Sequence, residues 1–197
     1  RSSRRASISP FAPGSRSSPS AASTGGLFCF LAASSFVFIR HFGFSMTAYG
    51  LVLLSLSVCY IGGTMLCRRM LMTAGMVRAL RLGGALSLGG GGLMAGLALA
   101  AIDTPWAVIV PAWLYMLGHG VHQPCGQSGA VAPFPKAAGA ASALAGFVMM
   151  AVAFATGRWV GAQMDGTAMP MVAGMAFWGL AAALLAWVFV PRSDTGH

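Results

Sequence analysis

The residues best suited to chemistry lie in one segment, 114–147, which is otherwise apolar and rich in glycine. Four polar side chains follow one another there at short intervals: His119, His122, Gln123 and Gln127. Residues three or four apart share a face of a helix, so we expect these four to form one polar stripe. Imidazole and amide groups donate and accept hydrogen bonds, and histidine can carry a proton. Such a stripe could contact a substrate or relay protons.

Two interpretations of this stripe remain open from the residues alone. Polar side chains within an apolar helix usually face the interior of a bundle or a cavity, which predicts a substrate-facing stripe. The same side chains can instead form hydrogen bonds that hold neighbouring helices together. A metal site is not expected, because His119 and His122 have only Cys125 nearby as a further ligand.

No catalytic pattern accompanies the stripe. The sequence contains no phosphate-binding glycine loop after a strand, no HExxH segment and no convincing Ser-His-Asp set. We therefore expect a protein that is not an enzyme and that needs no cofactor.

The composition defines the surroundings in which these residues act. Of the 197 residues, 57% are hydrophobic and 8% are charged, whereas a soluble domain usually has about 25% charged residues. So few charges cannot solvate a surface, which predicts an integral membrane protein in a lipid bilayer. The net charge of +9 does not indicate a nucleic-acid partner, because the arginines lie at the ends of apolar runs.

The four cysteines are not expected to form disulfides or zinc sites. Cys29, Cys59, Cys67 and Cys125 all fall in or beside apolar runs, and no two of them form a CxxC pair. We interpret them as small buried apolar residues.

The chain divides into three parts. Residues 1–20 are rich in serine, arginine and proline and are expected to be disordered. Residues 21–191 form a predicted transmembrane domain, and residues 192–197 form a polar tail. Because position 1 is not methionine, we expect a processed or truncated product. The domain contains six apolar runs long enough, at about 1.5 Å per residue, to span a bilayer: 21–39, 47–67, 82–101, 106–130, 137–162 and 168–190.

The basic residues predict the orientation of these spans. Ten of the twelve lysines and arginines fall at one set of ends, and only Arg40 and Arg158 fall at the other. Basic residues are enriched on the cytoplasmic side of a membrane. We therefore expect both termini, the 68–81 loop and Lys136 in the cytoplasm, with Asp103 and Asp165 outside.

Small residues indicate where helices could approach closely. Gly92 and Gly96 form a GxxxG pair in the third span, a spacing that permits close contact between membrane helices. In the fifth span, Gly139, Ser142 and Gly146 form a similar small-residue face. We predict that both sets pack against other helices.

Particular segments resemble the Bcr/CflA drug-resistance transporters of the major facilitator superfamily. SSFVFI at 34–39, FGFS at 42–45 and YG at 49–50 are similar to the end of the family's seventh helix and its outer loop. GHG at 118–120 with Pro124, PFP at 133–135, AG at 138–139 and ASALAGF at 141–147 resemble its tenth helix, inner loop and eleventh helix. The resemblance covers about residues 27–190, and the segment at 139–147 is its most specific part.

The resemblance implies that this chain is the C-terminal half, helices seven to twelve, of a twelve-helix transporter built from three-helix inverted repeats. It implies proton-coupled efflux of small hydrophobic drugs by alternating access, in the inner membrane of a bacterium. The family's coupling carboxylate and antiporter motif are expected in the missing N-terminal half, so this chain would need that half or a second copy of itself. The alternative is a truncated membrane protein that does not transport.

Overall fold

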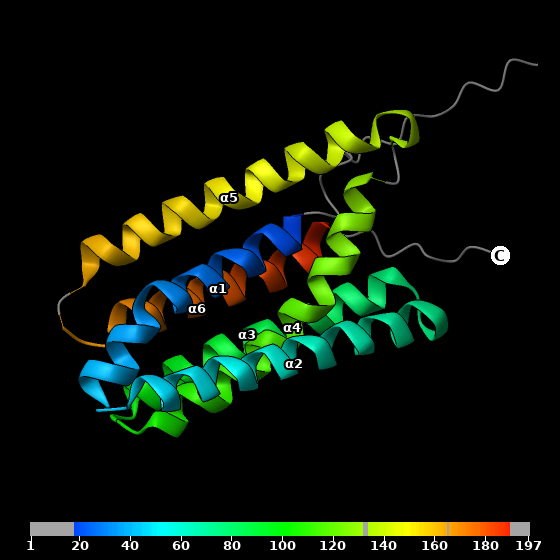
Figure 1. Ribbon diagram of the computed structural model, residues 1–197. Helices are drawn as coiled ribbons and strands as arrows, with labels where there is room; N and C mark the ends of the chain where they lie inside the picture. Colours follow the sequence, from blue (N-terminus) through cyan, green and yellow to red (C-terminus); the bar gives the residue numbers. More distant parts are fainter. Residues whose placement is uncertain (1–17, 132–133, 165, 190–197) are drawn as a thin grey trace, which may run out of the picture.

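The computed structural model describes residues 18–131, 134–164 and 166–189, and these form helices joined by short connections (Figure 1). Six long helices follow one another along the chain: α1 (Ser18–Ser35), α2 (Met46–Thr73), α3 (Met76–Leu99), α4 (Pro105–Val131), α5 (Ala138–Gln163) and α6 (Met169–Leu184). Two of them continue as π-helical segments, η2 (Phe36–His41) after α1 and η4 (Leu185–Phe189) after α6, and a short 3-10 helix, η3 (Pro135–Ala137), precedes α5. No strand occurs in the described ranges.

Five of the long helices are long and apolar enough to cross a membrane, so the chain has the character of an integral membrane protein. The sixth, α4, is also long enough, with 27 residues, but it is not among those five. Its apolar sequence is interrupted by two histidines, two glutamines and two internal prolines. The polar stripe therefore lies on the long helix that is not among those five.

The helix boundaries differ from the predicted spans mainly where arginines flank an apolar run. The first helix begins at Ser18, so residues 18–20 belong to it rather than to the leader. Residues 1–17 and 190–197, which include most of the predicted leader and the whole tail, lie outside the described residues. The second helix continues beyond Arg68 and Arg69 to Thr73. Arginine favours helix formation, so a helix can run past its apolar segment.

The turns between the helices have local causes. Gly75, between α2 and α3, has a φ of 84°, a conformation that glycine adopts readily. Pro105 is the first residue of α4, where its missing N–H has no partner to lose. Thr104 Oγ1 accepts a hydrogen bond of 3.3 Å from Ala107 N at the same end, and Ser45 caps α2 through Ala48 N at 3.1 Å.

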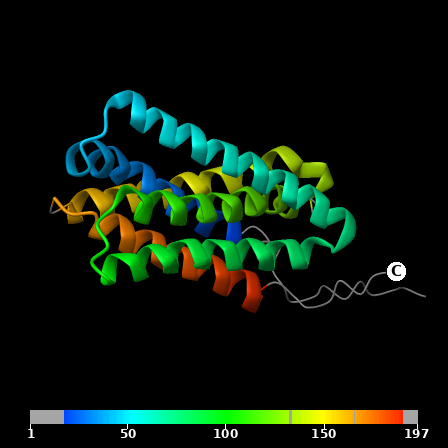
Figure 2. The same cartoon turned by 90° about the horizontal axis from the view of Figure 1, so that it is seen from below.

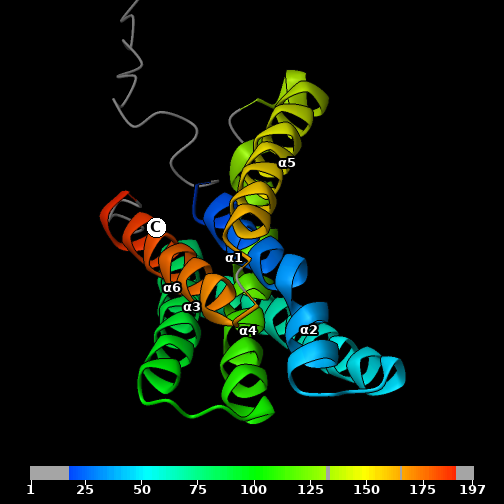
Figure 3. The same ribbon diagram turned by 90° about the vertical axis from the view of Figure 1, so that its left-hand side faces the viewer.

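The packing places α4 within the bundle. It contacts α1, α2, α3 and α5, while α6 packs against α1 and α3. Figure 2 shows α4 between α2 and α3. In the window of α1 that could span a membrane, 61% of residues are buried, whereas the corresponding value for α5 is 6%. Figure 3 shows α5 and α2 projecting in different directions from α1, so these two helices leave broad faces uncovered.

Candidate functional site: the polar segment of α4

His119 lies in the interior of the bundle, where α4 meets α1 and α2. It is 2% exposed, and its Nδ1 is 3.0 Å from Ser23 Oγ of α1. The Ser23 hydroxyl donates to Ser20 O at 3.0 Å, so its oxygen is left to accept a hydrogen bond from the imidazole. This arrangement suits the tautomer that carries its proton on Nδ1. The ring of Tyr60 in α2 lies 5.6 Å from the His119 ring.

His122 faces a different helix. Its side chain is 0% exposed, and Nε2 donates to Leu80 O of α3 over 3.3 Å. The opposite ring nitrogen, Nδ1, is buried without a hydrogen-bond partner. The ring fits against Gly83 so closely that a Cβ atom there would lie 2.8 Å from it. The two histidines therefore attach α4 to different neighbours.

The glutamines extend the polar segment toward the surface. Gln123 is partly buried and its Nε2 donates to Thr24 Oγ1 of α1 over 3.4 Å. Gln127, one helical turn further on, is exposed. The four side chains of the predicted stripe thus point in three directions. His119 and Gln123 point toward α1, His122 points toward α3, and Gln127 points toward the surface.

These contacts define what the segment can do. Three of its four side chains form hydrogen bonds to another helix, as the interhelical interpretation predicts. Of the four side chains, only Gln127 is exposed. Asp103 is the only carboxylate side chain in the described part of the chain and lies in the α3–α4 connection. The described residues contain no group of three His, Cys, Asp or Glu side chains that could hold a metal ion.

The glycines and serine predicted to pack face open space within this chain. A Cβ atom at Gly92, Gly96, Gly139 or Gly146 would contact nothing within 4 Å, and Ser142 is exposed. The reason lies in helix rotation and position. The buried face of α3 carries residues 83, 84, 87, 90, 91 and 94, which turns 92 and 96 outward, while α5 is the least covered of the five apolar helices.

Other glycines provide the close approaches. A Cβ at Gly120 of α4 would collide with Tyr60 O and would lie 3.0 Å from the Cα of Gly63 in α2. A Cβ at Gly118 would lie 2.6 Å from Ser87 Oγ of α3, and one at Gly90 would lie 2.7 Å from Pro111 O. Gly118 and Gly120 are thus packing residues, and they bring the polar segment of α4 against α3 and α2.

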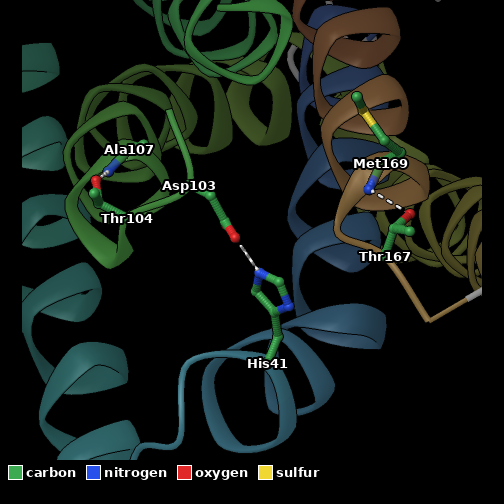
Figure 4. A network of polar contacts seen from close by, with 6 residues as sticks. All are labelled: His41, Asp103, Thr104, Ala107, Thr167 and Met169. Atoms are coloured by element: carbon green, nitrogen blue, oxygen red, sulfur yellow. Dashed lines mark hydrogen bonds and ion pairs between the residues drawn. The ribbon is translucent and has the colours of Figure 1, made fainter. Parts of the chain in front are cut away.

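A second polar feature lies where three connections meet at the far end of the bundle. His41 Nε2 is 2.8 Å and 2.9 Å from the two carboxylate oxygens of Asp103 (Figure 4). The pair borders an open pocket of about 290 Å³ whose wall also includes Phe42, Met94 and Thr167. His41 and Asp103 are 62 residues apart, and no spacing in the sequence indicated that they would meet.

The cysteines are free, and Cys29, Cys67 and Cys125 are buried while Cys59 is partly buried. The prediction of small buried residues therefore holds for Cys29, Cys67 and Cys125 but not for Cys59. One pair was not foreseen: Cys67 Sγ of α2 lies 3.0 Å from Cys125 Sγ of α4. These residues are 58 positions apart, so only the packing of the two helices brings them together.

In comparisons with protein-family models, with curated proteins and with solved structures, no match was found for this chain.

Proposed function

We propose that this chain is one six-helix half of a membrane transporter that exports small hydrophobic compounds in exchange for protons. The observation that carries the proposal is the polar segment of α4, which runs from buried His119 to exposed Gln127 among helices that are otherwise strongly apolar. Polar groups at membrane depth are costly, and they commonly mark substrate or proton pathways. In this proposal, His119, His122, Gln123 and Gln127 line the substrate pathway, and the two histidines are also the residues able to carry a proton.

The uncovered faces of α2 and α5 support a half rather than a whole transporter. Large apolar side chains are exposed along both helices: Leu51, Leu54, Val58 and Ile61 on α2, and Leu144, Phe147, Met150 and Phe154 on α5. In transporters built from repeated halves, the substrate site lies at the interface between the repeats. We propose that these faces contact a second six-helix half, which is either a missing N-terminal half or another copy of this chain. The proposed location is the bacterial inner membrane, with both termini in the cytoplasm.

A membrane protein that does not transport is the second candidate. It is favoured by the hydrogen bonds that His119, His122 and Gln123 already form within the bundle. It is also favoured by the position of Asp103 outside the helices, because proton relays in pumps and transporters typically use Asp, Glu or His side chains within the membrane.

A resistance assay in an efflux-deficient bacterial host separates the two candidates. The chain is expressed alone, with a matching N-terminal half, and as an empty-vector control, and the abundance of the inserted protein is measured in each case. Resistance that appears only on co-expression supports the half-transporter. If co-expression produces two stable, associated halves but neither resistance nor energy-dependent efflux of any compound in a broad panel, the proposal fails.

A further inference from the structure

A pair of thiols lies at the crossing of α2 and α4, outside the polar segment. Cys67 Sγ and Cys125 Sγ are 3.0 Å apart, and both residues are 0% exposed. Their surroundings form a small apolar cluster with Val77, Leu80 and Val121. No other pair of thiols within hydrogen-bond distance occurs among the described residues.

The pair lies close to an end of the bundle that carries exposed arginines. Cys67 directly precedes Arg68 and Arg69, which are both exposed. Gly63, which approaches Gly120 of α4, lies one helical turn before Cys67 in α2. The backbones are therefore close at this crossing, and the two thiols meet about one turn further along it.

We propose that Cys67 and Cys125 form an oxidisable dithiol that takes small two-electron thiol oxidants and becomes a disulfide joining α2 to α4. A disulfide has an S–S length of about 2.05 Å, so the two sulfur atoms need to approach by only about 1 Å. After one thiol has reacted, its partner is already within contact distance, which makes the second step intramolecular and fast. This inference does not depend on transport activity.

The reaction can be written fully for the azodicarbonyl oxidant diamide. One thiolate adds to the N=N bond, and the second thiolate attacks the sulfur of that adduct. Two S–H bonds are lost, one S–S bond forms, and the N=N bond is reduced to a hydrazine that takes up both electrons and both protons. A dithiol reductant reverses the change by thiol–disulfide exchange.

The new bond would hold the α2–α4 crossing closed. It links residues 58 positions apart, and a cross-link that closes a long loop restricts the unfolded chain. Typical stabilisation by a disulfide corresponds, for a chain of this size, to a rise of roughly 5–15 °C in the midpoint of thermal unfolding. Addition of a reductant should return the midpoint to its original value.

Thiol counting on the full chain tests the proposal. The purified protein is treated with diamide, denatured, and labelled with a maleimide–polyethylene glycol that adds one mass tag per free thiol. The sequence has four cysteines, so we expect four tags before oxidation and two afterwards, without dimer formation. Cys67→Ala should carry three tags under both conditions. A Cys29→Ala/Cys59→Ala double variant should change from two tags to none.

A second reagent tests the spacing of the thiols without oxidation. Phenylarsine oxide condenses with two neighbouring thiols and releases water, so it should block two tags in the wild type and none in Cys67→Ala or Cys125→Ala. Glutathione is added to the diamide reaction as a control, because its oxidation to the disulfide shows that the oxidant is active. Four tags on the wild-type chain after complete glutathione oxidation, or loss of tags only through intermolecular dimers, would overturn the proposal.

Discussion

At the scale of single residues, the polar and the smallest side chains of α4 act together. Gly118 and Gly120 allow the backbone of α4 to approach α3 and α2, and His119 lies between these glycines with its ring directed to Ser23 of α1. The close packing provides the geometry in which a buried imidazole finds a partner. Enlarging Gly118 or Gly120 should therefore also disturb the hydrogen bond of His119.

Enlarging Gly120 should destabilise the bundle. The Cβ atom of Gly120→Leu would collide with backbone atoms of Tyr60 and Gly63, which cannot move aside as a flexible side chain does. We expect a loss of about 1–3 kcal/mol, the usual range for overpacking. The measurement is reversible unfolding in detergent. Gly96→Leu is the matched control, because a Cβ at Gly96 meets open space. Equal losses in the two variants would contradict the packing described here.

The hydrogen bond between His119 and Ser23 should contribute little to stability and more to selectivity if the polar segment contacts substrate. His119→Ala removes this bond, and Ser23 retains its bond to Ser20 O. We therefore expect the lost hydrogen bond to cost about 0.5–1.5 kcal/mol of stability, and the cavity left by the buried ring to add to that loss. Drug preference, measured on co-expression with a matching N-terminal half, should change more than protein abundance. A fall in abundance with an unchanged preference would assign His119 a purely structural role.

Accessibility along α4 tests whether its polar end meets water. After the four native cysteines are replaced, single cysteines at positions 127, 123 and 121 are treated with a small membrane-impermeant thiol reagent from each side. Gln127 is exposed, Gln123 is partly buried and Val121 is 0% exposed, so reactivity should decrease in that order. Bound drug should slow the reaction at 123 and 127. If both positions react as slowly as 121, the exposed end of the stripe faces lipid rather than a cavity.

At the scale of the helices, the helix ends do not coincide with the ends of the apolar segments. Both α2 and α3 extend through the arginines that flank their apolar segments, because a helix continues as long as the backbone favours it, whether or not lipid surrounds it. The basic residues at 68, 69, 78 and 81 therefore lie near helix ends rather than in an extended loop, and Gly75 provides the turn between them. Arg68, Arg69 and Arg78 are exposed, whereas Nε and Nη2 of Arg81 are buried without a hydrogen-bond partner. This arrangement concentrates positive charge at one end of the bundle.

The charge asymmetry predicts the orientation of every helix. Arg68, Arg69 and Lys136 should face the cytoplasm, and the His41–Asp103 pair should face outside, because basic residues are retained on the inner side. Reporter enzymes fused after positions 103 and 136 measure this directly. We expect a periplasm-active reporter to work at 103 and a cytoplasm-active reporter to work at 136. The opposite pattern would reverse the proposed topology.

At the scale of the whole molecule, the bundle has an asymmetric surface. The helix α1 is the most covered of the five apolar helices, whereas α5 is the least covered, and α5 packs mainly along α1 (Figure 1). Exposed apolar side chains are expected wherever a membrane protein meets lipid. The low burial of α5 is also what we expect of a helix whose exposed face contacts a partner protein.

The isolated chain should not confer drug resistance. Its described carboxylate lies outside the helices, and the six-helix half that we propose would supply only one wall of a cavity between two halves. We expect the lone, membrane-inserted chain to give the same inhibitory drug concentrations as an empty vector. Energy-dependent efflux by the lone chain would refute this prediction. Cross-linking between copies through α5 would then show that two copies form the transporter.

The sequence by itself determined that this chain is helical and apolar, and it located the six helices to within a few residues at most ends, because length, hydrophobicity, glycines and prolines act locally along the chain. It also located the polar segment, since four polar side chains in an apolar run are conspicuous without any structure. Only the tertiary structure decided which residues meet. In helices that are apolar on nearly every side, the pattern of residues does not reveal how each helix is rotated. Gly63 and Gly120 rather than Gly92 and Gly96 form close contacts, and His119 pairs with Ser23 across 96 residues, because packing between helices fixes their rotation and brings distant residues together.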